Sequence, residues 1–157
     1  MNNNNKLLAF ISLVLSLSII FAGTNVYAET TFEKIKRTGK VTVGTEAAFP
    51  PFEFVEDGKI VGYGKDILDY IIADMGVELN QLDLPWQGIL PGVLAGKFDF
   101  VATSVSIRAE RAKKYAFTVP IAEGTNWVMK RSGDSSIMSP DDLSGKVVCT
   151  QLASGSE

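Results

Sequence analysis

The sequence predicts an α/β fold in which a mostly parallel sheet carries helices on its faces. Three observations support this. Residues 40–45 form a short run rich in β-branched side chains, residues 65–75 carry a helical stripe of apolar side chains, and residues 98–102 form an apolar run. Strands that alternate with helices through short connections favour parallel pairing by right-handed crossovers.

The first half of this pattern begins with a strand at residues 40–45. A turn at residues 56–59 then leads to a short strand at residues 60–61. The helix predicted at residues 65–75 has one apolar face, formed by Ile67, Leu68, Ile71, Ile72 and Met75. Gly76 follows it and is expected to end it, because glycine readily adopts the left-handed conformation found after helices.

The second half continues with a strand near residues 78–84. A helix is predicted at about residues 89–95, where Pro91 is tolerated because it falls in the first turn. Residues 98–102 then read as a buried parallel strand.

After Thr118 the chain changes character and reads as an extended crossing segment. Strands are predicted at residues 126–130 and 146–150. Between them we expect one turn of helix, capped by Ser139 and with Pro140 at its first position.

The N-terminus has the organisation of a secretory signal peptide. Lys6 supplies a positive charge, residues 7–22 form an uncharged apolar run, and Val26-Tyr27-Ala28 resembles a cleavage site. We predict a signal peptide at residues 1–28. The alternative, a membrane anchor, requires about 20 spanning residues, and this run is shorter and diluted by serines.

The single cysteine, Cys149, lies far from the predicted cleavage site. It cannot be the lipid-bearing first residue of a lipoprotein, and without a second cysteine it cannot form an internal disulfide. We therefore predict a periplasmic protein that is not a lipoprotein. Cys149 itself is expected to be a small buried hydrophobe.

Composition excludes several classes of function. The net charge is -3 without charge blocks, so nucleic acid is not an expected partner. The chain has no histidine, which removes Ser-His and Cys-His nucleophiles and the commonest zinc ligand. No phosphate loop is present, and Gly58, Gly62 and Gly64 read as turn glycines. No cofactor or metal is expected.

Three loops are expected to meet beyond the carboxyl ends of the predicted strands, where parallel sheets bind ligands. They are residues 46–52, 85–88 and 103–111. Together they carry an acid, two aromatic side chains, two hydroxyls and a cation: Glu46, Phe49, Trp86, Ser104, Ser106 and Arg111. Such a set fits a zwitterionic ligand, because a guanidinium suits a carboxylate.

Each of these residues also has a plainer interpretation. Arg111 matches a solvated helix face, and Phe49 and Trp86 match core packing. Glu46 matches a solvated turn acid, and Ser106 matches a helix N-cap. These alternatives remain open at the level of residue pattern.

Four motifs in order resemble the family 3 extracellular solute-binding proteins, the polar amino-acid receptors of bacterial ABC importers. They are Val-Gly-Thr-Glu-Ala-Ala-Phe-Pro-Pro-Phe-Glu-Phe at residues 43–54, Gly-Tyr-Gly-Lys-Asp-Ile at 62–67, Trp-Gln-Gly-Ile-Leu-Pro-Gly-Val-Leu-Ala-Gly-Lys-Phe-Asp at 86–99, and Ser-Ile-x-x-Glu-Arg-Ala-Lys-Lys at 106–114. The resemblance implies a two-lobed periplasmic-binding-protein-like fold of type II. Residues 29–124 would form a nearly complete first lobe, and residues 125–157 a hinge crossing and the beginning of a truncated second lobe.

The resemblance also implies roles for the site residues. Arg111 would hold the ligand carboxylate with help from Ser106, and the Ser104 carbonyl would accept from the ligand ammonium. Phe49 and Trp86 would sandwich the side-chain stem, and Glu46 would meet its polar end. The loop at residues 151–157, including Ser154, would present N–H groups to the carboxylate at a helix N-terminus.

The expected function is that of a monomeric binding protein, not an enzyme. It would bind a cationic or amide L-amino acid and deliver it to an ABC permease in the inner membrane. Two alternatives are a periplasmic cyclohexadienyl-type dehydratase, with Glu46 as acid or base, and the sensor domain of a larger membrane protein.

Overall fold

The structure is a computed structural model that describes residues 28–156. Apart from Ala28, the predicted signal peptide lies outside the described residues. In the part described, no helix combines the length and hydropathy needed to cross a membrane. The first element is the helix α2 (Thr31–Thr38), which Thr30 precedes. The Glu33 N–H donates to Thr30 Oγ1 at 3.2 Å and the Thr30 N–H donates to Glu33 Oε2 at 2.8 Å, which caps this helix reciprocally.

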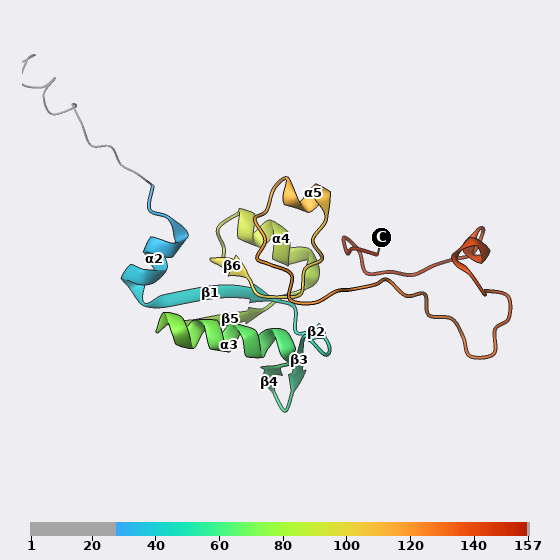
Figure 1. Ribbon diagram of the computed structural model, residues 1–157, viewed down its shortest axis with the longest axis horizontal. Helices are drawn as coiled ribbons and strands as arrows, with labels where there is room; N and C mark the ends of the chain where they lie inside the picture. Colours follow the sequence, from blue (N-terminus) through green and yellow to red (C-terminus); the bar gives the residue numbers. More distant parts are fainter. Residues whose placement is uncertain (1–27, 157) are drawn as a thin grey trace, which may run out of the picture. The chain divides into compact units, whose positions relative to one another are not determined.

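A three-stranded parallel sheet forms the centre of the fold (Figure 1). Its strand order is β5 (Glu78–Asp83), β1 (Lys40–Thr45) and β6 (Phe100–Val101), so β1 lies in the middle. β1 and β5 pair over their full length, and Val43 of β1 pairs with Phe100 of β6. The predicted parallel sheet is therefore confirmed, and β1 has the predicted bounds.

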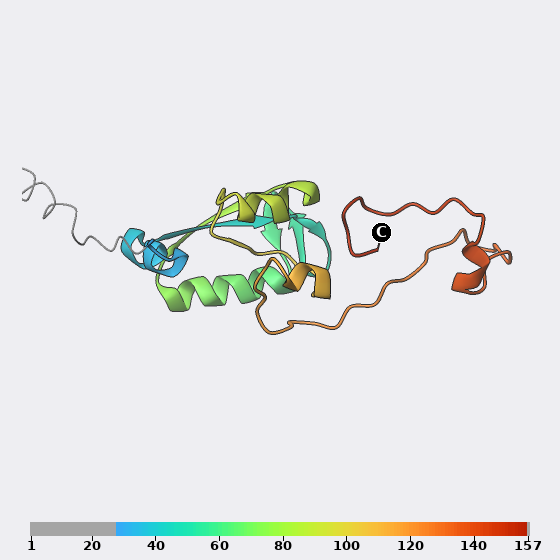
Figure 2. The same ribbon diagram turned by 90° about the horizontal axis from the view of Figure 1, so that it is seen from above.

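The two long helices cover opposite faces of this sheet, as Figures 1 and 2 show. Val41 and Val43 of β1 are fully buried and cluster with Leu68 and Ile72 of α3 (Tyr63–Met75). Because side chains alternate along a strand, Gly44 belongs to the other face, where α4 (Trp86–Leu94) packs on β1 and β6.

The ring of Phe98 fills a slot between β1 and α4. It is 4% exposed, and a Cβ atom on either Gly44 or Gly92 would come within 2.6 Å of it. Side chains at these two positions would collide with the ring, so both must be glycine for Phe98 to lock α4 onto the sheet.

Helix boundaries differ from the sequence prediction at their N-terminal ends. α3 begins at Tyr63, so Gly62 is its N-cap and Gly64 lies inside it, which corrects the prediction of a turn glycine at residue 64. α4 begins at Trp86, directly after Pro85, so Pro91 lies in the helix interior and not in the first turn. The end of α3 is as predicted, since Gly76 adopts φ 64° and ψ 39°.

A second, antiparallel sheet follows β1. Its order is β2 (Ala48–Phe49), β3 (Glu53–Glu56) and β4 (Lys59–Val61). The predicted turn at residues 56–59 is confirmed, since Asp57 and Gly58 both have positive φ, 50° and 73°. This conformation joins antiparallel strands tightly and is typical of an Asp-Gly pair.

Beyond β6 the described chain has little regular structure. It contains the helix α5 (Ala109–Ala112) and one 3-10 turn, η1 (Pro140–Leu143), whose N-cap is Ser139 and whose first residue is Pro140, as predicted. No strand forms at residues 126–130 or 146–150, so both strand predictions are wrong there. A strand requires a hydrogen-bonded neighbour, and here Val147 is 95% exposed. Cys149 is exposed as well, which corrects the prediction of a buried thiol.

Candidate ligand-binding site

The loops that follow β1, β5 and β6 meet at the carboxyl ends of these strands, as predicted. The Ala47 N–H donates to Asp83 Oδ1 at 2.9 Å, which joins the loop after β1 to the end of β5. Thr103 Oγ1 donates to the Glu46 carbonyl at 3.5 Å, which joins the loops after β1 and β6. Residues distant in the sequence thus line one edge of the sheet.

Arg111 and Trp86 form the centre of this site. The guanidinium carbon of Arg111 lies 5.3 Å from the centroid of the Trp86 ring, in a cation–π contact. Trp86 is 8% exposed, and its Nε1–H donates to the Ala153 carbonyl at 2.9 Å. Arg111 Nη1 donates to the Ser106 carbonyl at 3.2 Å, and Nη2 donates to the Ala153 carbonyl at 3.3 Å.

The charge of Arg111 has no carboxylate partner within residues 28–156, since none of the ion pairs there includes it. Burial lowers the pKa of Arg111 from its usual value, and the positive charge of Arg108 lowers it further. A guanidinium nevertheless remains protonated at physiological pH. The site therefore holds a cation whose donors face two neutral carbonyl oxygens.

Glu46 contacts a side-chain amide. Gln151 Nε2 donates to Glu46 Oε1 at 2.7 Å, across 105 positions of the sequence. Glu46 is partly exposed. Glu46 thus accepts a hydrogen bond from an uncharged amide donor.

The loop at residues 151–156 covers the guanidinium groups with carbonyl oxygens. Ala153 accepts from Arg111, and the Gly155 carbonyl accepts from Arg108 Nη2. No helix begins within residues 151–156, and the helix N-terminus expected at this loop stays a prediction. The Ser154 N–H donates to the Gln151 carbonyl at 3.1 Å, and Ser154 Oγ accepts from the Ser156 N–H at 3.1 Å.

Phe49 makes no ring contact with Trp86 in the described residues. Its ring stacks on Phe52 with a centroid distance of 5.5 Å and is 50% exposed. Phe52 in turn contacts the edge of Tyr63 at 6.2 Å. In the described part of the chain, Phe49 is exposed and packs on Phe52, whereas Trp86 is buried and packs on Arg111.

The two predicted serines sit on the loop after β6. Ser104 donates to Glu53 from its N–H and, at 3.0 Å, from its Oγ. The Ser106 carbonyl accepts from Arg111, and Ser106 is exposed. The N-cap of α5 is Arg108, so Ser106 does not cap that helix.

Glu53 is the residue that sequence reasoning missed. It is 2% exposed, and its carboxylate accepts from Thr103 as well as from Ser104. The Phe-Glu-Phe motif contained the residue but gave no local signal of burial, because its donors lie about 50 positions later in the chain.

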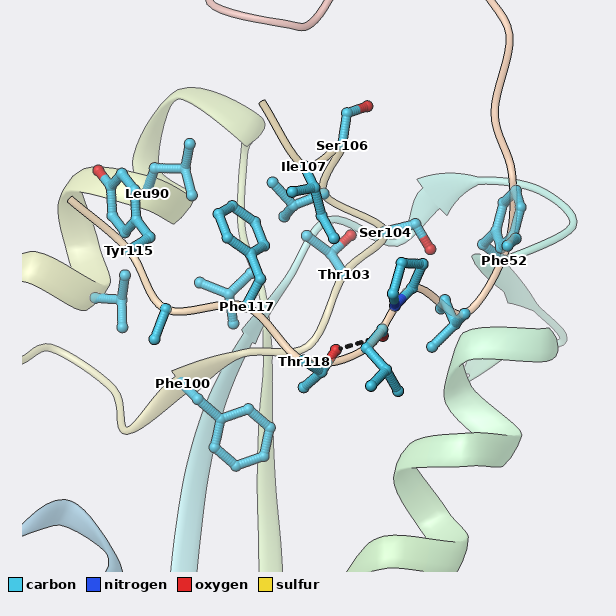
Figure 3. Close-up of a pocket in the computed structure, with 18 of the residues that line it drawn as sticks. Phe52, Leu90, Phe100, Thr103, Ser104, Ser106, Ile107, Tyr115, Phe117 and Thr118 are labelled. Carbon is cyan, nitrogen blue, oxygen red and sulfur yellow. Dashed lines mark hydrogen bonds between the residues drawn. The ribbon is translucent and has the colours of Figure 1, made fainter. Parts of the chain in front are cut away.

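An apolar cavity of about 930 Å³ lies on the β6 side of the sheet (Figure 3). Phe100, Phe117, Tyr115 and Leu90 line it, and Ser104 and Ser106 stand at one side of it. Arg111, Trp86 and Glu46 do not line it. In the described residues no group of His, Cys, Asp and Glu side chains is arranged to hold a metal ion.

The parallel sheet with a helix on each face belongs to the type II periplasmic-binding-protein fold, which a solved amino acid-binding protein shares. The chain belongs to the bacterial extracellular solute-binding proteins, family 3, whose sequence profile matches residues 41–150.

Three proteins illustrate what the chain is similar to. The L-cystine-binding protein TcyJ of Escherichia coli K12 is 33% identical over 126 residues, which are 79% of this chain and 47% of TcyJ. The arginine-bound form of truncated ArgBP from T. maritima is 40% identical with a TM-score of 0.50, over 52% of this chain and 39% of that one. The ancestral amino acid-binding protein AncCDT-1, a precursor of cyclohexadienyl dehydratase, is 34% identical with a TM-score of 0.52, over 54% and 38%. The chain spans about half the length of the curated relatives it matches.

Proposed function

We propose that this chain is the substrate-binding component of an ABC importer and binds a cationic or amide L-amino acid outside the cytoplasm. The observation that carries the proposal is Arg111. Its guanidinium is held on Trp86 at the carboxyl ends of a parallel sheet, and within residues 28–156 it is paired with no carboxylate. The α-carboxylate of an amino acid supplies the missing charge and accepts from both Nη atoms.

The ligand carboxylate takes the place of the Ala153 carbonyl in this proposal. A charged acceptor forms a stronger hydrogen bond with a guanidinium than a neutral carbonyl does, so the exchange is favourable. The loop at residues 151–156 then moves from the guanidinium to the ligand, and Ser154 contributes to holding it. Ser106 keeps Arg111 oriented through its carbonyl.

The opposite end of the ligand meets Glu46. Its carboxylate already accepts a side-chain amide, that of Gln151, at 2.7 Å. This contact supports a ligand whose side chain ends in a donor, either a cation or an amide. Phe49, exposed on the rim, and Trp86, beneath Arg111, contribute apolar surface for the stem between these ends.

The family supports a transport role, and the N-terminal sequence supports export. Family 3 members are extracellular solute-binding proteins, and the relatives described above are named for the amino acids that they bind. We infer that a signal peptide at residues 1–28 exports the protein without lipid, and that it acts as a monomer with a membrane permease. The ligand leaves the site chemically unchanged.

A calorimetric panel tests this function with protein made from the complete gene. L-arginine, L-lysine, L-histidine and L-glutamine are expected to bind, and L-glutamate and L-leucine are expected to bind more weakly. Mass spectrometry of the released ligand should recover it unaltered. Tightest binding of glutamate or leucine rejects the ligand class, and a chemically altered ligand rejects the binding-protein assignment.

A further inference from the structure

Glu53 is a buried carboxylate beside the ligand-binding site. Its residue is 2% exposed and stands on β3, directly opposite Phe49 of β2. Carboxylates are rarely buried to this extent unless they are paired or hydrogen-bonded. Within residues 28–156, none of the ion pairs includes Glu53, so no cation neutralises it there.

Neutral donors from one short segment hold this carboxylate. Thr103 Oγ1 donates to Oε1 at 2.6 Å, the Ser104 N–H donates to the same oxygen, and Ser104 Oγ donates to Oε2 at 3.0 Å. Figure 3 shows Thr103 and Ser104 as neighbours on the loop after β6. Glu53 therefore fixes this loop to the antiparallel sheet.

The first turn of α3 makes room for the carboxylate. A Cβ atom on Gly64 would lie 2.6 Å from Glu53 Oε2, so only glycine lets the helix backbone come this close. The N–H groups of Tyr63 and Gly64 donate to the carbonyls of Pro51 and Phe52 beside it, at 3.0 and 2.8 Å. The first turn of α3 is thereby joined to the backbone that precedes Glu53.

Ser104 has a carbonyl oxygen that remains available as an acceptor. Glu53 uses both donors of Ser104, and in the described part of the chain no donor reaches the Ser104 carbonyl oxygen. The Ser104 carbonyl oxygen therefore remains as an acceptor near the buried carboxylate of Glu53. An acceptor beside a negative charge attracts an ammonium group.

We propose that Glu53 is a positioning residue for the α-ammonium group of the ligand: it orients Ser104 so that its carbonyl accepts from the ammonium, and its buried charge strengthens that contact. This inference rests on the proposed function, since it requires an amino-acid ligand.

The test compares ligands with and without the ammonium group in protein made from the complete gene. The probes are L-arginine, L-lysine and L-glutamine, each measured against its des-amino analogue by calorimetry. Glu53→Gln removes the charge and keeps one oxygen acceptor, which can still accept from Thr103 Oγ1 and the Ser104 N–H. It should weaken the tightest-binding amino acid on the order of 10-fold to 100-fold and its des-amino analogue by less than about twofold. Glu56→Gln removes an exposed charge from the same strand and should change neither.

A second variant moves the carboxylate without removing its charge. Gly64→Ala brings a Cβ against Oε2 while alanine favours the helix, so α3 should persist. Hydrogen exchange should then show faster exchange of the Ser104 N–H, together with the same selective loss of amino-acid affinity. An equal loss for both ligand types, or no loss in either variant, overturns the inference. Failure of the unmodified protein to bind any amino acid overturns the proposed function, and this inference with it.

Discussion

The guanidinium of Arg111 and the indole of Trp86 share a single acceptor, the carbonyl oxygen of Ala153, at 3.3 and 2.9 Å. One oxygen atom thus occupies the point where both side chains direct a donor. An anion placed there gains a charge-assisted bond from Arg111 and a neutral bond from Trp86. The first prediction follows from this geometry.

Arg111→Ala should weaken amino-acid binding by about 2–5 kcal/mol, because it leaves the ligand carboxylate buried and unpaired. Arg111→Lys should recover only part of this, since an ammonium lacks the planar fork. Calorimetry measures both. Lys114→Ala removes an exposed cation just beyond α5 and is the matched control. Unchanged affinity in Arg111→Ala would return Arg111 to the role of a solvated helix residue.

Glu46 should determine which class of ligand side chain the site prefers. Glu46→Gln removes the charge but keeps an acceptor, so cationic amino acids should lose more affinity than glutamine does, by about 1 kcal/mol or more. A thermal-shift panel with L-arginine, L-lysine and L-glutamine measures the change in rank. Equal losses for all three ligands would contradict the assignment of Glu46 to the ligand side chain.

Phe98 should be a principal stabilising residue of the parallel sheet. Phe98→Ala empties the slot between Gly44 and Gly92 and should lower the free energy of unfolding by about 3–5 kcal/mol. Gly92→Val should also destabilise, because its side chain enters the space of the ring. Denaturant unfolding measures both, and Gly88→Ala, where a Cβ meets no atom within 4 Å, is the control.

The turn η1 should depend on pH through Asp142. The N–H groups of Met138 and Ser139 donate to its Oδ2 at 2.8 Å, and these bonds lower the pKa of Asp142. Because the pKa of Asp142 is lowered, its carboxylate stabilises the turn fully above the ordinary pKa of an aspartate. This stabilisation is lost as the pH falls through the lowered pKa. Amide shifts of Met138 and Ser139 should follow this titration by NMR, and Asp142→Asn should abolish it. Shifts that do not move with pH would count against the cap.

Export should remove residues 1–28. The charge at Lys6, the apolar run and Val26-Tyr27-Ala28 predict that the secreted protein begins at Glu29 and carries no lipid. N-terminal sequencing and intact mass of periplasmic protein measure this. Recovery of a chain that still begins at Met1 would show that the segment is retained.

The sequence was most informative where structure is local. β1, the end of α3 and the Asp57-Gly58 turn were predicted because β-branching, helical periodicity and turn chemistry act over a few residues. The starts of α3 and α4 were missed by two and three residues, since Gly62 and Pro85 give no side-chain cap. Their true starts depend on packing against residues that are distant in the chain.

Long-range contacts were harder to predict. The convergence of three loops followed from the rule for parallel sheets, and it placed Arg111 and Trp86 in one site. Glu53 was missed because a glutamate in an alternating strand is normally exposed, and its burial depends on donors in another loop. The strand predicted at residues 146–150 failed because apolar residues alone do not make a strand without a paired neighbour.

The exposure of Cys149 makes the chain convenient to label. It is the only cysteine, and it lies two residues before Gln151, whose amide contacts Glu46. A maleimide fluorophore would attach at this one position without any engineered residue. Because the neighbouring loop at residues 151–156 covers Arg111 through Ala153, its displacement by a ligand would change the emission of the dye. The native thiol thus provides an optical reporter of ligand binding.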